Sequence, residues 1–290
     1  MRHDPRITPA RGDLAAEHLA GLVEAERFVP PTPRSVCVPL APVTATADGA
    51  AEMTTELLWG EAFDTYEEDG MWAWGQARRD GYVGYVPRTC LDTAVDTLPT
   101  HRIAALSAPA FAVPDFKTRP GGHIPCGARV AVDGIVDGNQ ARYARLAGGG
   151  FVPQAHLARL DTPASDWAGE AERFLGTPYL WGGRSPMGID CSALVQLALD
   201  AAGQPCPRDT DMQAGEVGET VAPGTPPQRG DLIFWKGHVG VMLDAERLLH
   251  ANIHHMAVAI ETLAGASARI AARDGSAVTR HARPGPDTRP

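Results

Sequence analysis

One cysteine stands where a thiol can act as a nucleophile. Cys191 follows a glycine-rich run over residues 175–190 and opens the apolar run CSALVQLALDAA, which Gly203 ends. This pattern predicts a buried helix that begins at Cys191, because glycine is common just past the last helical turn. A sulfur at a helix start lies near unpaired backbone N–H groups and the positive end of the helix dipole, which favours thiolate over thiol. The alternative is an inert, buried cysteine.

A thiolate nucleophile needs a partner that holds and returns a proton near neutral pH, and histidine suits both roles. His238 is the leading candidate, since it follows the predicted Lys236-Gly237 turn and starts a strand-like run. Strand alternation places Gly240 on the same face, where its small size leaves room beside the imidazole. The alternative is a strand histidine without a catalytic role.

The imidazole also needs an acceptor that fixes its tautomer. His250 lies twelve residues after His238, the separation expected for the neighbouring strand of an antiparallel pair. Asn252 and Asp244 are the alternative third members. The sequence therefore predicts a Cys-His-His site.

The elements that position these residues occupy the last part of the chain. A helical run starts at Trp167, the glycine-rich loop and the helix at Cys191 follow, and a predicted hairpin over residues 231–243 precedes a short run over residues 247–250. A helix ahead of a small antiparallel sheet is the α+β order of papain-like folds. We expect this catalytic domain to cover residues 162–290.

The preceding residues have a different texture. Residues 1–30 read as a helical lead-in that ends at a proline cluster, and short β-prone runs follow, with Asp69-Gly70 and Asp80-Gly81 at hairpin positions. The run GYVP at residues 84–87 recurs as GFVP at residues 150–153, and a leucine follows each after three residues. Unless the match is chance, it indicates two successive units that resemble bacterial SH3-like (SH3b) domains, over residues 31–97 and 98–161. The predicted fold class is α+β, with a papain-like catalytic domain behind two small SH3-like β-barrels.

Composition narrows the range of partners. The 290 residues include 26 basic and 35 acidic side chains, and the net charge of −9 disfavours nucleic acid as a partner. No run is long and apolar enough to cross a membrane, and the N-terminal residues do not read as a secretory signal, so we expect a cytoplasmic protein. The five cysteines show no CxxC spacing, which suggests neither a disulfide framework nor a zinc site, and burial is expected for the four besides Cys191.

The ordered motifs of residues 165–285 resemble those of NlpC/P60 peptidases. They are the glycine-rich loop, Asp-Cys-Ser at a helix start, the strand Gly-Asp-Leu-Ile-Phe-Trp, the strand Gly-His-Val-Gly and a later histidine. With an SH3-like pair in front, the chain most resembles the γ-D-glutamyl-L-diamino acid endopeptidases, also described as dipeptidyl-peptidase VI, which act on short muropeptides. The resemblance implies cleavage of the amide between γ-D-glutamate and diaminopimelate or lysine, without a cofactor.

Roles for individual residues follow from this resemblance. Cys191 would attack the γ-carbonyl, His238 would protonate the departing amine and then activate water, and His250 would orient His238. Tyr179 and the Cys191 backbone N–H would meet the oxyanion. Asp190 would hold the amine of the substrate, because a carboxylate beside a thiolate calls for a cation; its alternative role is a helix N-cap.

Further residues match positions near the substrate groove or in the first SH3-like unit. Ser192, Trp181 and the turn Arg208-Asp209-Thr210 belong to the groove or simply to its wall. Glu56, Glu61 and Tyr82 would close the groove at the end where the free amine of L-Ala binds, although exposed acids and aromatics are common without such a role. The predicted product is L-Ala-D-Glu, released during peptidoglycan recycling.

Three rival interpretations are open. Three histidines at positions 250, 254 and 255 suggest a metal site, but no HExxH motif or carboxylate at ligand spacing accompanies them, and we expect none. A protein that only binds wall fragments would not need the complete Cys-His-His set. A papain-like amidase or acyltransferase on another substrate would use the same thioester. The choice between diaminopimelate and lysine, and the oligomeric state, are not determined by the sequence.

Overall fold

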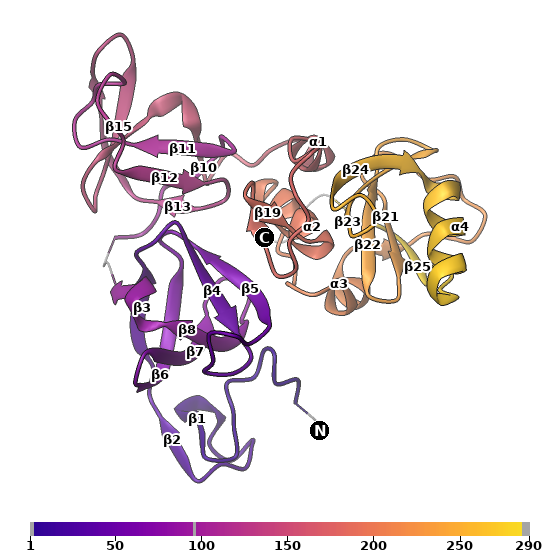
Figure 1. Cartoon of the computed structure of the whole chain (residues 1–290), viewed down its shortest axis with the longest axis horizontal. Helices are drawn as coiled ribbons and strands as arrows, with labels where there is room; N and C mark the ends of the chain where they lie inside the picture. The colour runs from indigo at the N-terminus through magenta and orange to yellow at the C-terminus, as the bar shows by residue number, and fades with distance from the viewer. Residues whose placement is uncertain (1–2, 95–96, 286–290) are drawn as a thin grey trace. The chain divides into compact units, whose positions relative to one another are not determined.

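A computed structural model of the chain describes residues 3–94 and 97–285. The chain divides into two compact units, Met1–Asp161 and Thr162–Pro290 (Figure 1). All four α-helices of the described residues lie in the second unit, while the first is built from strands and short 3₁₀ turns. This mixed content confirms the α+β class.

The first thirty residues do not form the predicted helical lead-in. The described part has two short parallel strands, β1 (Leu14–Ala16) and β2 (Arg27–Val29), with a 3₁₀ turn at Glu17–Leu19 between them. Leu14 and Ala16 are fully buried in a cluster with Tyr66 and Trp74 of the following sheet. Short isolated helices are marginal in water, and here burial against the sheet outweighs helix propensity.

A seven-stranded antiparallel sheet follows, in the order β5-β4-β8-β7-β6-β3-β9. Turns at Gly70 (φ 54°) and Gly81 (φ 77°) join β6 to β7 and β7 to β8, which confirms both predicted hairpins. The core beneath the sheet includes Phe63 and Tyr82. The strands are β3 (Thr32–Val36), β4 (Leu40–Thr44), β5 (Met53–Leu58), β6 (Ala62–Asp69), β7 (Trp72–Ala77), β8 (Val83–Pro87) and β9 (Leu91–Thr93).

The rest of the first unit holds three small sheets, ordered β13-β10-β17, β11-β12 and β14-β15-β16. Their strands are β10 (His101–Ile103), β11 (Ser107–Ala110), β12 (Gly122–Pro125), β13 (Arg129–Val130), β14 (Val132–Asp137), β15 (Arg142–Leu146), β16 (Phe151–Pro153) and β17 (Leu157–Arg159). The repeated tetrapeptides adopt the same local structure. Pro87 and Pro153 each end a strand with nearly equal backbone angles (φ −58° and −55°), and a 3₁₀ turn and another strand follow each.

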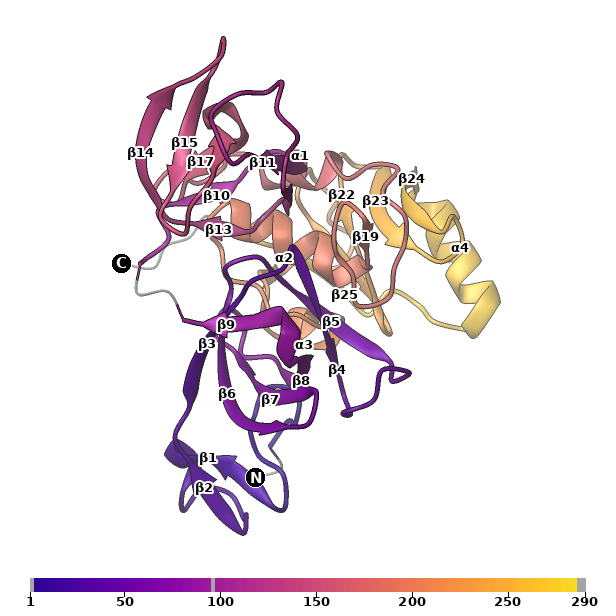
Figure 2. The same cartoon turned by 60° about the vertical axis from the view of Figure 1, so that its left-hand side comes forward.

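The second unit centres on a six-stranded sheet in the order β20-β25-β21-β22-β23-β24. In Figures 1 and 2, α2 and α4 flank this sheet. None of the helices in the described residues combines the length and apolar character that a membrane span requires. The elements are α1 (Trp167–Glu172), β18 (Arg184–Ser185), β19 (Gly188–Ile189), α2 (Cys191–Ala201), α3 (Thr210–Glu216), β20 (Glu219–Thr220), β21 (Leu232–Trp235), β22 (His238–Met242), β23 (Arg247–Asn252), β24 (Ala257–Thr262), α4 (Leu263–Asp274) and β25 (Arg280–Arg283).

Two predicted features of this unit are confirmed. Helix α2 begins at Cys191, and all of its residues but Asp200 are buried. The helix ends before Gly203, whose backbone has a left-handed conformation (φ 75°). The hairpin of β21 and β22 turns at Lys236-Gly237, so Trp235 pairs with His238. Strand β23 then pairs antiparallel with β22 and carries His250.

Candidate active site

The sulfur of Cys191 lies at the buried start of α2, with 6% of the residue exposed. Its Sγ is 3.7 Å from the hydroxyl oxygen of Thr210, at the start of α3. The backbone N–H of Val239 on β22 also donates to this sulfur. The nucleophile is thus held between two helix starts and the strand that carries His238.

The thiol of Cys191 is not the resting thiolate that the helix dipole alone predicted. Burial first, and the adjacent Asp190 charge second, raise its pKa to about 11, against smaller opposing effects of Thr210, Val239 and Arg208. Burial disfavours the charged form of a thiol, and here it outweighs the helix start. Deprotonation therefore needs a base or a cation that arrives with the substrate.

The other four cysteines confirm the predicted burial only in part. Cys126 and Cys206 are buried, whereas Cys37 and Cys90 are partly exposed where β9 joins β3. All five are free thiols in the described residues. Strand ends in a small sheet leave such positions open to solvent.

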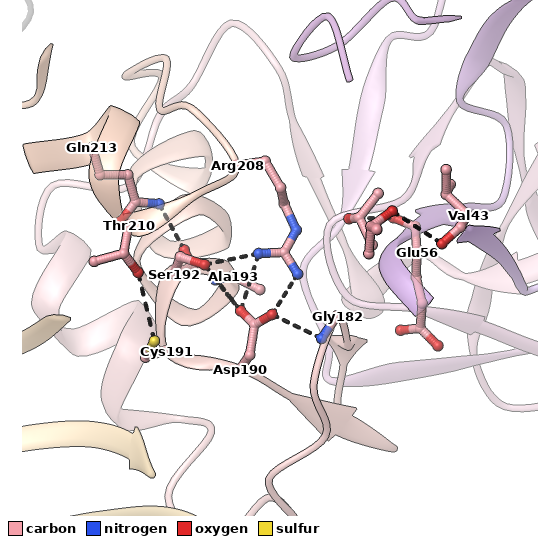
Figure 3. Close-up of polar contacts among 12 residues, drawn as sticks. Val43, Glu56, Gly182, Asp190, Cys191, Ser192, Ala193, Arg208, Thr210 and Gln213 are labelled. Carbon is pink, nitrogen blue, oxygen red and sulfur yellow. Dashed lines mark hydrogen bonds and ion pairs between the residues drawn. The ribbon is translucent and has the colours of Figure 1, made fainter. Parts of the chain in front are cut away.

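Asp190 is the N-cap of α2 and the centre of a buried network (Figure 3). Its Oδ1 accepts from the Ala193 N–H at 2.8 Å, and its Oδ2 accepts from the Gly182 N–H at 3.0 Å. The guanidinium of Arg208, 1% exposed, donates to both carboxylate oxygens, at 3.0 and 2.6 Å. The network fixes the backbone on both sides of the helix start.

This network changes the interpretation of Asp190. The cation expected beside it is Arg208 of the same chain, so a substrate amine is not needed to balance the carboxylate. The hydrogen bonds show the alternative role, the helix N-cap, while the predicted contact of Asp190 with a substrate amine stays a prediction. The predicted groove residue Arg208 is likewise a buried partner of Asp190 and not an exposed wall residue.

His238 and His250 lie on adjacent strands, and their rings are joined by a 2.8 Å contact between Nε2 of His238 and Nδ1 of His250. The Nε2 of His250 is 2.7 Å from the Oε1 of Glu261 on β24, which also pairs with Arg269 of α4. Burial is the main cause that lowers the pKa of His238 to about 3 and that of His250 to about 4. Both imidazoles are therefore neutral in the resting site.

Gly240 is required beside this pair, although its neighbour differs from the one predicted. A Cβ at Gly240 would lie 2.7 Å from a methyl carbon of Leu248 and 3.2 Å from the Cβ of His250. The glycine therefore makes room for β23 and for the root of His250. The alternatives to His250 have structural roles: Asp244 accepts from Arg247 in the turn before β23, and Asn252 accepts from the His255 N–H.

Tyr179 lies close enough to the nucleophile for their charges to interact. The pKa of its hydroxyl is raised by burial first and then by the negative charges of Cys191 and Asp190. Its hydroxyl therefore keeps its proton near neutral pH. A protonated phenol is the form that can donate to an oxyanion.

The remaining predicted groove residues separate into three kinds. Ser192 is buried, with its hydroxyl accepting from Arg208 at 2.8 Å, so it belongs to the Asp190 network. Thr210 contacts the sulfur, and the partly exposed Asp209 precedes it at the start of α3. Trp181 is 57% exposed in the glycine-rich loop. Of these predicted groove residues, Thr210 is the one whose side chain contacts the sulfur of the nucleophile.

In the first unit, Glu56, Glu61 and Tyr82 are all buried rather than exposed. Glu61 accepts from the Leu58 N–H at 3.0 Å and pairs with Arg79, which fixes the turn between β5 and β6. Tyr82 packs in the core of the seven-stranded sheet, and Glu56 lies on β5. Their predicted reach into the groove stays a prediction.

The histidine cluster does not form a metal centre in the described residues. Among residues 3–94 and 97–285, no group of three or more His, Cys, Asp or Glu side chains is arranged to hold a metal ion. His254 and His255 lie on the exposed turn after β23, where their rings stack edge to face.

Sequence reasoning missed two kinds of residue around the site. Glu261 and Arg269 extend the histidine pair, and the buried Gln213 donates to the Ser192 and Pro207 carbonyls. Pairing of β23 with β24 places Glu261 opposite Leu248, diagonal to His250. A correct strand register would have found Glu261, because diagonal neighbours on a sheet face lie within reach of long side chains.

Comparison with protein families gives two matches. The NlpC/P60 family matches residues 176–270, and the bacterial dipeptidyl-peptidase SH3 domain matches residues 44–91. These matches identify an NlpC/P60 domain, and with it the papain-like fold, behind an SH3-type domain.

Two curated relatives are similar over different lengths. Dipeptidyl-peptidase 6 of Lysinibacillus sphaericus is 36% identical over 31% of this chain and 33% of its own length. Gamma-D-glutamyl-L-lysine dipeptidyl-peptidase of Bacillus subtilis is 28% identical over 72% of this chain and 75% of its own length. The chain thus spans a third of the first relative and three quarters of the second. These relatives support a cysteine-type peptidase.

Among solved structures, an NlpC/P60 family protein from Bacillus cereus superimposes with a TM-score of 0.69 at 20% identity, over 80% of this chain and 94% of that one. An NlpC/P60 endopeptidase from Photobacterium damselae gives a TM-score of 0.58 at 12% identity, over 86% and 70%. At these identities the likeness concerns the fold.

Proposed function

This chain carries an NlpC/P60 domain and a bacterial dipeptidyl-peptidase SH3 domain, and we propose that it hydrolyses the amide between γ-D-glutamate and a diamino acid in peptides from peptidoglycan. The observation that carries the proposal is the site itself. Cys191 starts a buried helix against β22, the strand whose first residue, His238, contacts His250 at 2.8 Å. The names of the relatives supply the substrate class.

The residues suit a two-step hydrolysis. The Cys191 thiol transfers its proton to His238 as its sulfur bonds to the γ-carbonyl carbon, and the amide C–N bond then breaks as His238 returns the proton to the leaving amine. Water attacks the thioester with His238 as base, and the thiol is released. Because both groups are neutral at rest, the proton moves from Cys191 to His238 together with the attack of the sulfur, and no ion pair needs to form beforehand.

The oxyanion of each tetrahedral intermediate needs donors. The Tyr179 hydroxyl keeps its proton near neutral pH, and the backbone N–H of Cys191 lies at a helix start, where no residue one turn earlier accepts it. Each such donor can be worth about 3 kcal/mol of transition-state stabilisation.

We further propose that the substrate has a free N-terminal L-Ala, so that L-Ala-D-Glu leaves as a dipeptide. The relatives named dipeptidyl-peptidases support this choice. Asp190, whose carboxylate already pairs with Arg208, is the predicted anchor of this amine, and Glu56, Glu61 and Tyr82 are the further predicted candidates. The cellular role proposed with it is recycling of trimmed muropeptides in the cytoplasm.

The first test is mass spectrometry of L-Ala-γ-D-Glu-diaminopimelate and of its L-lysine counterpart after incubation with the protein. We expect free diamino acid and L-Ala-D-Glu, and neither product with Cys191→Ala. An intact peptide with wild-type protein would favour a binding protein. A transferred acyl product would favour an acyltransferase.

The second test addresses the free amine. We compare kcat/KM for the free peptide, its N-acetylated form and the N-acetylmuramyl peptide. Leaving buried acceptors unpaired costs about 1–3 kcal/mol, so acetylation should lower kcat/KM by about tenfold or more. Equal values for the three substrates would contradict the dipeptidyl specificity while leaving the peptidase assignment intact.

A further inference from the structure

The contacts beyond His250 form one continuous chain of side chains on three elements. His238 on β22 contacts His250 on β23 at 2.8 Å, His250 contacts Glu261 on β24 at 2.7 Å, and Glu261 pairs with Arg269 on α4. His250 is fully buried, so its two ring nitrogens have only these partners to satisfy them among the hydrogen bonds of the described residues. The protons along the chain therefore depend on one another.

The end of the chain sets the direction of its hydrogen bonds. An ionised carboxylate can only accept, so Nε2 of His250 must carry the proton that it shares with Glu261. In a neutral imidazole the other nitrogen is then an acceptor, so Nδ1 of His250 accepts from Nε2–H of His238. The same rule leaves Nδ1 of His238 without a proton.

Arg269 holds the carboxylate in the state that this order needs. Its guanidinium and the His250 ring together keep the pKa of Glu261 below its ordinary value, against the effect of burial. With the opposite order, His250 would turn a lone pair toward the carboxylate and His238 would carry its proton on Nδ1. In that order Nδ1 of His238, the ring nitrogen that does not contact His250, would carry a proton and could not act as a base.

We propose that Glu261, held by Arg269, is a positioning residue that fixes the tautomers of both histidines and leaves Nδ1 of His238 as the base for Cys191. The inference rests on the proposed function for its catalytic consequence, whereas the proton order is a property of the resting protein. It extends the Cys-His-His site by two residues that never touch the substrate.

The register of the sheet explains why Glu261 reaches His250. Ala259 lies directly opposite His250, and its small side chain leaves the space that Glu261 crosses from its diagonal position. Arg269 follows on α4, two turns after the Thr262 N-cap. Other charged groups face the pair as well: Arg273 of α4 acts on His238, and His255 of the following turn acts on His250.

The direct test is the tautomeric state of the histidines in the whole, substrate-free chain. Nitrogen-15 NMR of histidine-labelled protein at pH 7, with signals assigned through His238→Gln and His250→Gln, reports which ring nitrogen carries the proton. We expect the Nε2–H form for both residues. A proton on Nδ1 of either histidine would overturn the proposal, and this readout does not depend on any substrate.

The kinetic test compares two replacements of Glu261. Glu261→Leu removes the acceptor and should lower kcat at least tenfold with little change in KM, the magnitude expected for a group that orients a catalytic imidazole. Glu261→Gln keeps an acceptor oxygen and should recover most of kcat. Since it removes the negative charge, its pH profile of kcat should shift toward lower pH.

A matched control separates these effects from general loss of an ion pair. Glu170→Gln removes the carboxylate of α1 that pairs with Arg173, the C-cap of that helix, and should leave kcat and the pH profile unchanged. Wild-type kcat in Glu261→Leu, or an unshifted profile in Glu261→Gln, would contradict the proposal. If Glu261→Leu fails to fold, the histidine tautomers of the wild-type chain, measured by NMR, still test the proposal. Absence of cleavage by wild-type protein would contradict the proposed function alone.

Discussion

Two carboxylates in the second unit each pair with an arginine, but they serve different parts of the site. Asp190 accepts backbone N–H groups of Gly182 and Ala193 as well as Arg208, so it fixes the peptide backbone around the nucleophile. Glu261 accepts from the ring of His250, so it acts on the position of a proton. The ion pair of Asp190 thus stabilises the backbone at the start of α2, which we call the helix side of the site. The ion pair of Glu261 acts on the reactivity of the histidines on β22 and β23, which we call the sheet side.

The largest effect should come from the nucleophile, which the helix side holds in place. Cys191→Ala should abolish turnover while the free energy of unfolding stays near that of wild type, because the change removes a reacting atom and leaves the N-cap intact. Release of diamino acid from the tripeptide measures it. Alanine at Cys37, Cys90, Cys126 or Cys206 should keep most activity. Turnover by Cys191→Ala would show that Cys191 is not the nucleophile, and the comparison of the two carboxylates around it would lose its basis.

The sheet side should show a graded loss. His238→Ala removes the group that transfers the proton and should cost about 10²–10⁴-fold in kcat, whereas His250→Asn leaves an amide that can accept from His238 and should cost less. Steady-state kinetics at saturating substrate measures both. Equal losses, or a greater loss in His250→Asn, would show that the roles are reversed.

Local pattern in the sequence was enough to find the reacting groups. The start of α2 at Cys191, the turn at Gly237 and the pairing of the strands that carry His238 and His250 all follow from periodicity and glycine placement. These features depend on neighbours within about a dozen residues. The helical lead-in failed for the opposite reason, because Leu14 is buried against residues of a sheet far along the chain.

The charges around the site required the tertiary structure. The sequence showed Asp190 beside Cys191 and predicted a cation near it, but the cation is Arg208, which the loop after α2 brings back. Glu261 became visible only with the register of β23 and β24. The raised pKa of Cys191 also depends on burial by several elements, which a helix start alone does not reveal.

A stability measurement sharpens the contrast between the two carboxylates. Asp190→Asn keeps a side chain that can cap α2 but removes the carboxylate charge that pairs with the guanidinium of Arg208, which is 1% exposed. Breaking a buried pair in this way costs about 3–5 kcal/mol. Urea unfolding of Asp190→Asn should show this loss, and Glu261→Gln, whose arginine has a side chain 22% exposed, should lose less.

The double variant Asp190→Asn/Arg208→Met is the control for this loss. It removes the buried guanidinium of Arg208 as well, so it should be more stable than Asp190→Asn alone. A double variant that is less stable by the sum of the two single losses would show that the pair is not coupled. Equal destabilisation by Asp190→Asn and Glu261→Gln would remove the distinction between the two sides.

The smallest effect expected is a pH dependence of stability that originates on the sheet side. In the folded chain the pKa of His238 is lowered to about 3 and that of His250 to about 4, chiefly by burial, whereas an unfolded histidine titrates near 6.5. Between about pH 6.5 and pH 4 the unfolded chain therefore binds protons that the folded chain does not, and stability must fall as the pH falls, by up to about 1.4 kcal/mol per pH unit for each histidine. The pKa of Glu261 is lowered as well, but its contribution is lost only below about pH 4.3, the ordinary value of an unfolded glutamate, so the two effects separate along the pH axis. Urea unfolding at pH 7, 6 and 5 measures the slope. His250→Asn should flatten it. An equal slope in wild type and His250→Asn would mean that the buried pair is already protonated in the folded chain, and the neutral resting state would be wrong.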